Sequence, residues 1–328
     1  MTLDNFPVAI IGGGPIGLAA AAHAVARGLP VKVYEAGATV GANLLDWGHV
    51  RVFTPWELNI DAAARTLLER HGWTPPPAGE LPTGGDLYTR YLKPLAETPE
   101  LAPAIEVGAR VEAISRRGAD KVVSKDRATK PFQLQIAGRD GARRTDFARA
   151  VIDASGTWNT PNPLGAAGLP ASGESENSER IAYGMPDILG RDRATYAGRR
   201  TLVIGAGYSA ANVLLDLARL AQDAPDTSVT WVVRGTDLVR VYGGGLADQL
   251  PARGELGWLL KALVDREAVT LVLGFAATAV HTVDDTLVLE GDTTEGRRRL
   301  GPVDRIVVAT CQRPDLTMTR ELRLEPWP

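Results

Sequence analysis

Three glycines near the N-terminus have a spacing that suits phosphate binding. Gly12, Gly14 and Gly17 form a GxGxxG pattern directly after the apolar run 8–11. In this pattern the first glycine makes a tight turn, the second lets the backbone approach a pyrophosphate, and the third lets a helix pack closely on a strand. Glu35 follows 18 residues after Gly17, where a carboxylate accepts hydrogen bonds from a ribose diol. The pattern therefore predicts a dinucleotide site.

The same pattern returns in the middle of the chain with one change of charge. Gly205 and Gly207 occupy its first two positions, and an alanine, which is a permitted variant, occupies the third. Arg234 stands where the first copy has Glu35. A carboxylate there repels a 2′-phosphate, whereas an arginine pairs with one. The second site is therefore predicted to take NADP(H), with Arg240 as another candidate for the phosphate; the alternative for either arginine is a solvated surface charge.

Strands and helices of an α/β fold must position these glycines. A short apolar run precedes each pattern and is typical of a strand buried on both faces, and a helix-forming stretch follows each one. A second strand then leads to the acidic or the basic residue. The predicted elements are strand 8–11, helix 18–27 and strand 31–34 in the first copy, and strand 201–204, helix 209–222 and strand 229–233 in the second.

A β-meander, a final apolar strand and a turn of small residues follow each copy. The segments are 132–136 and 144–152 with the turn 153–156 in the first half, and 286–290 and 303–308 with turns at 291–292 and 309–311 in the second. The predicted fold class is α/β, with two Rossmann-like (doubly wound) dinucleotide-binding domains, each with a β-meander and the second inserted in the first. The polar segment 169–180 is expected to be a linker, and 116–130 a solvated hairpin.

Composition and charge exclude several classes of protein. The 328 residues are 45% hydrophobic and 23% charged, which is ordinary for a globular protein. The net charge is −3 and the longest run of like charge is 297–299, so we expect no nucleic-acid or membrane partner. A single cysteine, Cys311, excludes an internal disulfide. The four histidines lack metal-ligand spacing, so no metal is expected.

The apolar N-terminal stretch does not have the pattern of a secretion signal. Residues 7–26 carry no charge, but the residues before them include an aspartate and no lysine or arginine. A signal peptide needs a positive segment there, and the several glycines suit a turn better than a membrane span. We therefore expect a cytoplasmic protein that acts on a small-molecule substrate, with a homodimer left open.

The repeated plan resembles the two-dinucleotide-binding flavoproteins. These include flavin-dependent monooxygenases of the FMO and Baeyer–Villiger type and thioredoxin-reductase-like enzymes. The segments 157–163, 196–200 and 312–315 are most similar to the monooxygenase branch. The resemblance implies FAD in the first site and NADPH in the second. The predicted cofactor-binding residues are Gly12, Gly14, Pro15, Ile16, Gly17, Glu35, Val111, Ser155, Gly156, Gly205, Gly207, Tyr208, Ser209 and Arg234.

The resemblance also implies the domain limits. An FAD-binding domain is predicted over 1–164 and an NADP(H)-binding domain over 165–314, and 315–328 is expected to begin a return segment to the first domain. In the family this segment carries a Gly-Asp pair that holds the flavin. Only 17 residues follow Cys311, and none forms that pair. We therefore expect a truncated or degenerate form that holds FAD weakly or not at all.

The sequence departs from the family at three further points. No histidine lies in 183–187, where the monooxygenase signature FxGxxxHxxx(Y/W) is expected. The CxxC pair of the thioredoxin-reductase branch is absent. Cys311 stands where the family turn, and Gly156 in the first copy, have glycine; at a positive φ a cysteine costs on the order of 1 kcal/mol or more. The alternative is a reactive thiol beside the flavin.

The leading hypothesis is an FAD- and NADPH-dependent oxidoreductase, with oxygenation of a small organic substrate as its finer form. One alternative is a non-catalytic dinucleotide-binding protein such as a redox sensor, and another is a flavin-free NADPH-dependent reductase. No catalytic residue is assigned, and His49, Arg51 and Trp56 are weak candidates in the loop 43–59. This loop covers the flavin in relatives, or its tryptophans fill a cleft between domains. The glycine-rich loop 242–249 either covers the nicotinamide or is a plain connector.

Overall fold

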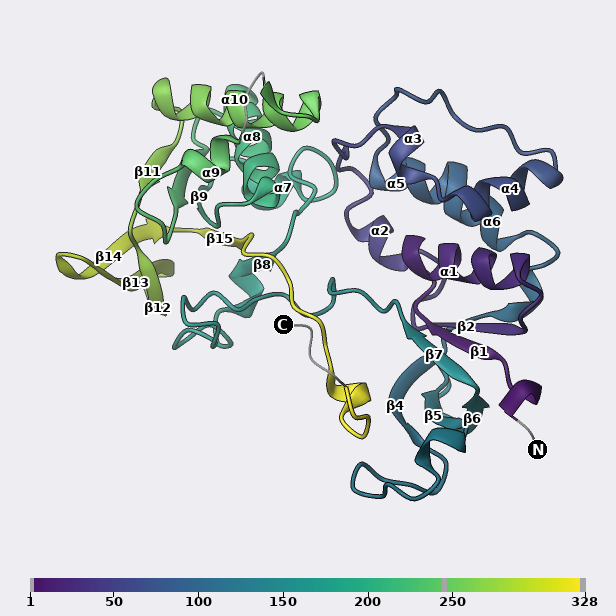
Figure 1. The fold of residues 1–328 in the computed structure, drawn as a ribbon. Helices are drawn as coiled ribbons and strands as arrows, with labels where there is room; N and C mark the ends of the chain where they lie inside the picture. The colour runs from purple at the N-terminus through teal and green to yellow at the C-terminus, as the bar shows by residue number, and fades with distance from the viewer. Residues whose placement is uncertain (1–2, 244–246, 325–328) are drawn as a thin grey trace. The chain divides into compact units, whose positions relative to one another are not determined.

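The computed structural model describes residues 3–243 and 247–324, without the side chain of Arg240, and the chain divides into two compact units (Figure 1). Unit 1 comprises residues 1–159 and 314–328, and unit 2 comprises 160–313, so the second unit is inserted in the first. Each unit has one parallel and one antiparallel sheet. The predicted fold class is confirmed.

Unit 1 is built on a parallel sheet of strand order β3-β2-β1-β7. These strands are β1 (Val8–Ile11), β2 (Val31–Glu35), β3 (Ile105–Val107) and β7 (Ala150–Asp153). The helix α1 (Pro15–Ala26) connects β1 to β2 as predicted. Further helical segments between β2 and β3 are α2 (Ala42–Asp46), α3 (Trp56–Asn59), α4 (Ala62–Arg70), α5 (Gly84–Leu87), η2 (Tyr88–Leu92) and α6 (Lys93–Ala96).

The antiparallel sheet of unit 1 forms a separate layer. It contains β4 (Arg110–Arg116), β5 (Phe132–Ala137) and β6 (Arg143–Ala148). Side chains of β1 alternate between the two faces of the parallel sheet, as a pleated strand requires. Val8 and Ile10 pack in a core with the helices, and Ala9 and Ile11 pack in a second core with the meander. Each large apolar side chain buried in this way contributes about 1.5–3 kcal/mol, and the alternation fixes the register of the central strand.

Unit 2 repeats this plan with one strand more. Its parallel sheet has the order β11-β10-β9-β15-β8, and its meander is β12-β13-β14. The strands are β8 (Ile181–Tyr183), β9 (Arg200–Ile204), β10 (Ser228–Val232), β11 (Thr270–Val272), β12 (Ala276–Val283), β13 (Thr286–Thr293), β14 (Gly296–Val303) and β15 (Arg305–Val308). The helices are α7 (Arg193–Tyr196), α8 (Tyr208–Asp223), α9 (Val239–Tyr242) and α10 (Pro251–Asp265).

Two sequence-based expectations of local structure are wrong. The turn expected at 291–292 lies at 294–295, because β13 continues to Thr293. Gly291 is a strand residue, and a Cβ there would lie 2.4 Å from the ring of Phe275, so packing and not a turn explains the glycine. The segment 144–152 is two strands in different sheets, β6 and β7.

The segment 116–130, predicted to be a solvated hairpin, is a mostly exposed connection between the antiparallel strands β4 and β5. After β4 it forms a loop with a short 3-10 turn, η4 (Arg127–Thr129). Arg127 is buried and donates to the backbone carbonyl of Glu321 at 2.8 Å. The loop is therefore attached to the C-terminal segment. In the described ranges, no helix combines the length and hydropathy of a membrane span.

Candidate cofactor sites

Close backbone packing requires two glycines of the first pattern. Gly12 has a φ of +100°, and a Cβ atom there would lie 2.4 Å from the carbonyl oxygen of Ala154. A Cβ atom at Gly17 would lie 1.9 Å from the carbonyl oxygen of Gly12. The absence of side chains thus lets β1, α1 and the turn after β7 come together. These two glycines are explained by the protein alone.

Gly14 is different, because nothing in the protein requires it. Its backbone is extended, with φ −79° and ψ −173°, a conformation that any residue adopts. A Cβ atom there would have no protein atom within 4 Å. The open space lies at the N-terminus of α1, where backbone N–H groups and the helix dipole favour an anion. The predicted pyrophosphate loop therefore has room for its ligand at the position where glycine lets a phosphate approach.

Glu35 lies against this glycine loop. Its Oε2 accepts a hydrogen bond from the N–H of Gly13 at 2.7 Å, and its Oε1 accepts one from the N–H of Gly37 at 2.6 Å. The two bonds fix the carboxylate at the carboxyl end of β2. Each carboxylate oxygen can accept a further hydrogen bond, so this arrangement permits the predicted contact with a ribose diol, which stays a prediction.

The other predicted residues of unit 1 lie on three elements. Pro15 and Ile16 begin α1, and the side chain of Ile16 is 72% exposed. Ser155 donates through its N–H and hydroxyl to the carboxylate of the last residue of β7, at 3.0 and 2.6 Å. Gly156 follows with a φ of +73°. The side chain of Val111 is buried in the meander core, so only its backbone is available to a ligand.

One of the three catalytic candidates is a core residue. Trp56 is 1% exposed among the helices of unit 1, with the guanidinium of Arg90 5.3 Å from its ring centroid. Arg51 is exposed and donates to a backbone carbonyl. His49 has a buried Nε2 without a hydrogen-bond partner in the described part of the chain. The burial of Trp56 argues against a catalytic role, while the roles of His49 and Arg51 stay predictions.

The loop 43–59 is fastened to the turn that follows β7. The indole N–H of Trp158 donates to Asp46 Oδ2 at 2.8 Å, and its ring centroid lies 6.4 Å from that of Trp47. All of these residues belong to unit 1. The loop contains α2 and α3, which the sequence pattern did not predict. Its predicted role as a cover over the flavin stays a prediction.

The backbone of the second pattern repeats the geometry of the first. Gly205 has a φ of +139°, and a Cβ there would lie 2.3 Å from the carbonyl oxygen of Ala309. Gly207 is extended, with φ −107° and ψ 179°, and a Cβ there would have no neighbour within 4 Å. Ala210, at the third position, is fully buried. The same close approach and the same open space occur twice in the chain.

A cavity of about 850 Å³ lies at the carboxyl ends of β9, β10 and β15 in unit 2. Ligands of open α/β sheets bind outside this edge. The predicted residues Gly205, Gly207, Tyr208 and Arg234 line it, and Ser209 follows Tyr208 in the first turn of α8. The other lining residues are 162–166, 168, Ile204, Ala206, Val233, Gly235, Asp237, Val241, Phe275, Ala277, 309–311 and Arg313.

Two guanidiniums face this cavity, although only one was predicted. Arg234 is exposed and donates through Nη1 to the carbonyl oxygen of Ala166 at 2.8 Å. Arg313 packs on Gly168, where a Cβ would lie 2.5 Å from its Nη2. The segment 312–315 looked family-like in the sequence, but no local pattern marks Arg313 as a cavity residue. Long-range folding brings it beside Gly168.

Cys311 lines the same cavity in a strained backbone. It is exposed and has a φ of +68°, as the glycine of the first copy has +73°. The condition under which a backbone cost is expected for this cysteine is therefore met. The backbone carbonyl of Cys311 accepts a hydrogen bond from the N–H of Asn162 at 3.0 Å, so the turn is tied to the start of unit 2.

Only the ends of the glycine-rich loop 242–249 can be described. Tyr242 ends α9, and Gly243 follows with a φ of +61°. Residues 244–246 lie outside the described residues, as does the side chain of Arg240. The predicted roles of this loop and of Arg240 therefore stay predictions.

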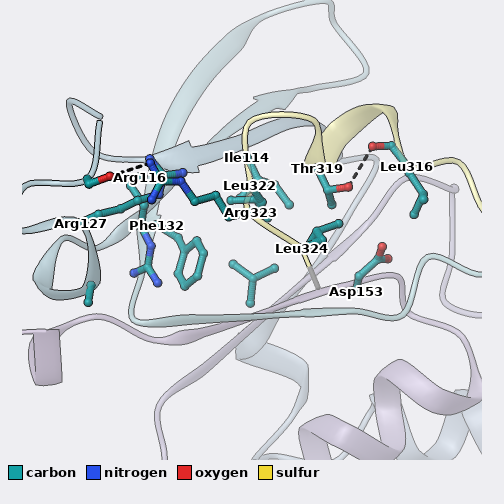
Figure 2. Close-up of a pocket in the computed structure, with 13 residues that line it drawn as sticks. Ile114, Arg116, Arg127, Phe132, Asp153, Leu316, Thr319, Leu322, Arg323 and Leu324 are labelled. Carbon is teal, nitrogen blue, oxygen red and sulfur yellow. Dashed lines mark hydrogen bonds between the residues drawn. The ribbon is translucent and has the colours of Figure 1, made fainter. Parts of the chain in front are cut away.

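A second cavity, of about 580 Å³, lies in unit 1 between the meander, β7 and the C-terminal segment (Figure 2). Apolar side chains such as Phe132 and Leu322 line it together with three arginines, and none of the predicted cofactor residues does. Arg323 donates to the backbone carbonyls of Lys121 and Val122, at 2.8 and 2.9 Å. Arg127 and Arg323 thus hold the C-terminal segment on the loop after β4.

Comparisons with known proteins agree with this geometry. The profile of the pyridine nucleotide-disulphide oxidoreductase family matches residues 6–326. Indole-3-pyruvate monooxygenase YUCCA1 from Oryza sativa subsp. japonica is 28% identical over 304 residues, which is 90% of this chain and 62% of that protein. The chain thus spans less than two thirds of the length of that relative.

Solved structures show the same fold at low identity. Bacillithiol disulfide reductase Bdr from Bacillus cereus is 18% identical, with a TM-score of 0.73 over 96% of this chain and 81% of that one. Ornithine N-hydroxylase from Kutzneria sp. 744, solved with reduced FAD, NADP+ and L-ornithine, is 18% identical, with a TM-score of 0.65 over 97% and 84%. A flavin monooxygenase from Stenotrophomonas maltophilia is 22% identical, with a TM-score of 0.60 over 97% and 81%.

These matches support the predicted flavin-dependent oxidoreductase and its cofactors, FAD and NADPH, and leave the substrate open. The family profile covers nearly all of the chain, including both glycine patterns and both meanders. The chain therefore belongs to the pyridine nucleotide-disulphide oxidoreductase family.

Proposed function

We propose that the chain is an oxidoreductase in which unit 1 binds FAD and unit 2 binds NADPH. The observation that carries the proposal is the open position at Gly14 and again at Gly207. At both, an extended glycine at a helix N-terminus has no protein atom within 4 Å of its Cβ position. Packing explains the other glycines of the two patterns, so a ligand that approaches the backbone best explains these two.

The residues of unit 1 fit a dinucleotide with a free ribose diol. The loop from Gly12 to Gly17 would hold the pyrophosphate, and the fixed carboxylate of Glu35 would accept the hydroxyl groups of the ribose. A 2′-phosphate would meet the negative charge of Glu35 and would be repelled. FAD has the free diol, and this distinguishes it from NADPH at this position.

The residues of unit 2 fit the phosphorylated coenzyme. Arg234 lies two residues after the end of β10 at Val232, whereas Glu35 is the last residue of β2. By the strand pairing, Arg234 is one residue farther along than Glu35, and Arg313 adds a second positive charge at the same cavity. A guanidinium can bind a phosphate through two parallel hydrogen bonds. Asp237 is an acidic group on the lining, and it would disfavour a phosphate placed beside it. We therefore assign the binding of the 2′-phosphate to Arg234 and to the loop around Ala166, whose carbonyl oxygen accepts a hydrogen bond from this arginine.

The finer part of the proposal is oxygenation of a small organic substrate. A bound flavin supplies hydride acceptance from NADPH and electron transfer to an acceptor. In a monooxygenase reaction, one NADPH, one proton and one O2 are consumed for each substrate oxygenated, and one water is released. The rice relative and the structure from Stenotrophomonas maltophilia are monooxygenases by name, and the structure from Kutzneria is named an N-hydroxylase. The described residues of this chain would bind and orient both cofactors. Trp47 and Trp158 would cover apolar surface near the turn after β7.

One experiment tests the cofactors and the reaction type together. The purified chain is incubated with excess FAD, and its visible spectrum is recorded before and after NADPH or NADH is added without oxygen. We expect FAD binding and loss of the flavin absorbance with NADPH, and much slower loss with NADH. Oxygen uptake after air is admitted then reports whether O2 is the acceptor.

The other outcomes identify the alternatives. Failure to bind added FAD together with NADPH binding would favour a flavin-free reductase, and binding of both without turnover would favour a redox sensor. The amount of FAD that remains after gel filtration tests the expectation that FAD is held weakly. Full occupancy without added FAD would contradict that expectation.

A further inference from the structure

A buried carboxylate lies in the segment that the sequence presents as a polar linker. Glu174 is 6% exposed, whereas Glu176 in the same segment is exposed. Its Oε1 accepts a hydrogen bond from the N–H of Leu164 at 2.9 Å, and its Oε2 accepts one from the N–H of Ala171 at 2.6 Å. The segment is therefore folded around Glu174 within unit 2 and is not a solvated connection.

Tyr183, at the end of β8, completes the surroundings of this carboxylate. Its hydroxyl donates a hydrogen bond to Glu174 Oε1. Burial, this hydrogen bond and the charge of Glu174 raise the pKa of Tyr183, so the hydroxyl keeps its proton as a donor at physiological pH. No lysine, arginine or histidine forms an ion pair with Glu174 in the described ranges. A buried carboxylate without a cation needs such donors to persist.

The two backbone bonds of Glu174 hold both ends of the loop 164–171. This loop forms one wall of the cavity in unit 2, through Leu164, Gly165, Ala166 and Gly168. Inside it, the N–H of Gly168 donates to the carbonyl of Gly165 at 3.0 Å, and the N–H of Ala166 donates to the meander. A single side chain therefore determines the shape of the loop at both of its ends.

The loop in turn holds the positive charges of the cavity. The carbonyl oxygen of Ala166 accepts the hydrogen bond from Arg234 Nη1, and Gly168 leaves the space in which the guanidinium of Arg313 packs. A free arginine side chain loses rotamer entropy when it is held in one position. If the loop holds Arg234 in advance, less of this entropy is lost when a phosphate binds.

We propose that Glu174 is a positioning residue for coenzyme selection: it fixes the loop 164–171, whose Ala166 carbonyl holds Arg234 ready for the 2′-phosphate of NADPH. This inference rests on the proposed NADPH site in unit 2. A role in stability alone would weaken the binding of phosphorylated and non-phosphorylated coenzymes to the same degree. A positioning role acts through Arg234 and therefore changes the preference between them.

The test compares Glu174→Gln with Glu176→Gln in the full chain with FAD supplied. In Glu174→Gln, an amide NH2 group replaces one of the two carboxylate oxygens. This NH2 group then faces a backbone N–H group and cannot accept its hydrogen bond, so one end of the loop is released. Dissociation constants for NADP+ and NAD+ are measured by isothermal titration calorimetry. We expect Glu174→Gln to raise the Kd for NADP+ about tenfold, as one lost charge-assisted contact would. The Kd for NAD+ should change by less than about twofold, and Glu176→Gln should change neither.

A double-mutant cycle with Arg234→Ala tests whether the effect passes through the arginine. We expect Glu174→Gln to have no further effect on the Kd for NADP+ once Arg234 is alanine. Independent effects that multiply, or equal effects of Glu174→Gln on both coenzymes, would overturn the inference and leave the NADPH site intact. If the wild-type chain binds NADP+ no better than NAD+, the proposed function and the inference both fail.

Tyr183→Phe keeps the inference testable if Glu174→Gln does not fold. This variant removes one of the three donors that hold the carboxylate, so Glu174 fixes the ends of the loop less firmly while both backbone bonds can still form. We expect a smaller rise of the Kd for NADP+ in the same direction, of about two- to threefold, and again little change for NAD+. An unchanged preference in Tyr183→Phe, with normal thermal stability, would count against the inference.

Discussion

Unit 1 and unit 2 have the same strand order in their parallel sheets up to the fourth strand, and they differ in three features. The order β3-β2-β1-β7 corresponds to β11-β10-β9-β15, and a meander follows the third strand in both. The second strand leads to Glu35 in unit 1 and to Arg234 in unit 2. The final turn has Gly156 in one and Cys311 in the other. In unit 2, β8 pairs with the outer edge of β15, while in the described part of unit 1 β7 pairs only with β1.

The comparison separates what the backbone does from what one side chain does. Gly12 and Gly205 both place their Cα against a carbonyl oxygen of the closing turn, and Gly14 and Gly207 both leave open space. This shared backbone is suited to a pyrophosphate in either unit. In the proposed function, the sign of the charge after the second strand decides which ribose is accepted. Each prediction below changes one feature that the two units share or in which they differ.

The largest effect is expected from filling the tight glycine position. Gly12→Ala places a Cβ about 2.4 Å from a carbonyl oxygen at a positive φ, so we expect a loss of stability of about 3 kcal/mol or more. Gly14→Ala should leave stability within about 0.5 kcal/mol, because its Cβ meets no protein atom, while FAD binding weakens about tenfold. Urea unfolding and FAD titration measure the two quantities.

Gly79→Ala is the matched control for Gly14→Ala. Gly79 is exposed, also has no neighbour within 4 Å of its Cβ position, and lies outside the glycine loop. We expect no change in either measurement. Equal FAD affinity in Gly14→Ala and Gly79→Ala would show that the open position is not where the cofactor approaches.

The second effect exchanges the charge that distinguishes the units. Arg234→Glu gives unit 2 the acidic residue of unit 1, so the 2′-phosphate meets repulsion where it met attraction. We expect the Kd for NADP+ to rise about 100-fold, and that for NAD+ to fall or stay constant. Binding calorimetry on the full chain measures both. A similar loss for both coenzymes would mean that Arg234 does not contact the phosphate.

The repeated architecture could be predicted from the sequence because its signals are local. The apolar runs and the glycine spacing at Gly12 and Gly205 specify strand, turn and helix within about thirty residues. The β–α–β units and both meanders followed from them. The boundaries that failed are at Gly291 and Arg149, where a glycine in a strand and a change of sheet depend on long-range packing.

The parts of the candidate site that could not be predicted depend on contacts between distant residues. Glu174 lies in a stretch of small and polar residues, and only folding shows that its carboxylate closes the loop 164–171. Arg313 comes to the cavity from the far end of unit 2. Arg127 is charged and follows a basic stretch, which is typical of a solvated surface, yet it is buried by its bonds to backbone carbonyls. Composition does not encode such partners.

The third effect concerns a charge in α8 that α1 lacks. Asp216 occupies the position in α8 that His23 occupies in α1, because each follows the first glycine of its pattern by the same number of residues. His23 Nε2 lies 3.0 Å from Asp61 Oδ2. Burial, with a smaller contribution from the charge of Asp187, raises the pKa of Asp216 to about 6. A carboxyl group with a raised folded pKa favours the folded state below its unfolded pKa, and this contribution is lost as the pH rises through about 6.

Asp216→Asn should therefore stabilise the chain only when the aspartate would be charged. We expect a gain of about 2 kcal/mol at pH 7.5 and almost none at pH 4, a discounted value for a partly exposed group. Urea unfolding of both proteins across this pH range gives the difference directly. A gain that does not depend on pH would mean that the charge of Asp216 is not the cause.

The smallest effect concerns the closing turn. Cys311 has the left-handed backbone that Gly156 has in unit 1, and relief of this strain by Cys311→Gly is worth about 1–2 kcal/mol. The greater freedom of glycine in the unfolded chain offsets about 0.5–1 kcal/mol of that gain. We therefore expect a net stabilisation of about 0.5–1 kcal/mol in Cys311→Gly and none in Cys311→Ala, which keeps a Cβ. Thermal unfolding of the two variants separates backbone strain from the chemistry of the thiol, because both variants lack sulfur and only Cys311→Gly lacks the Cβ. Equal stability of the two variants would mean that the turn stores no backbone strain.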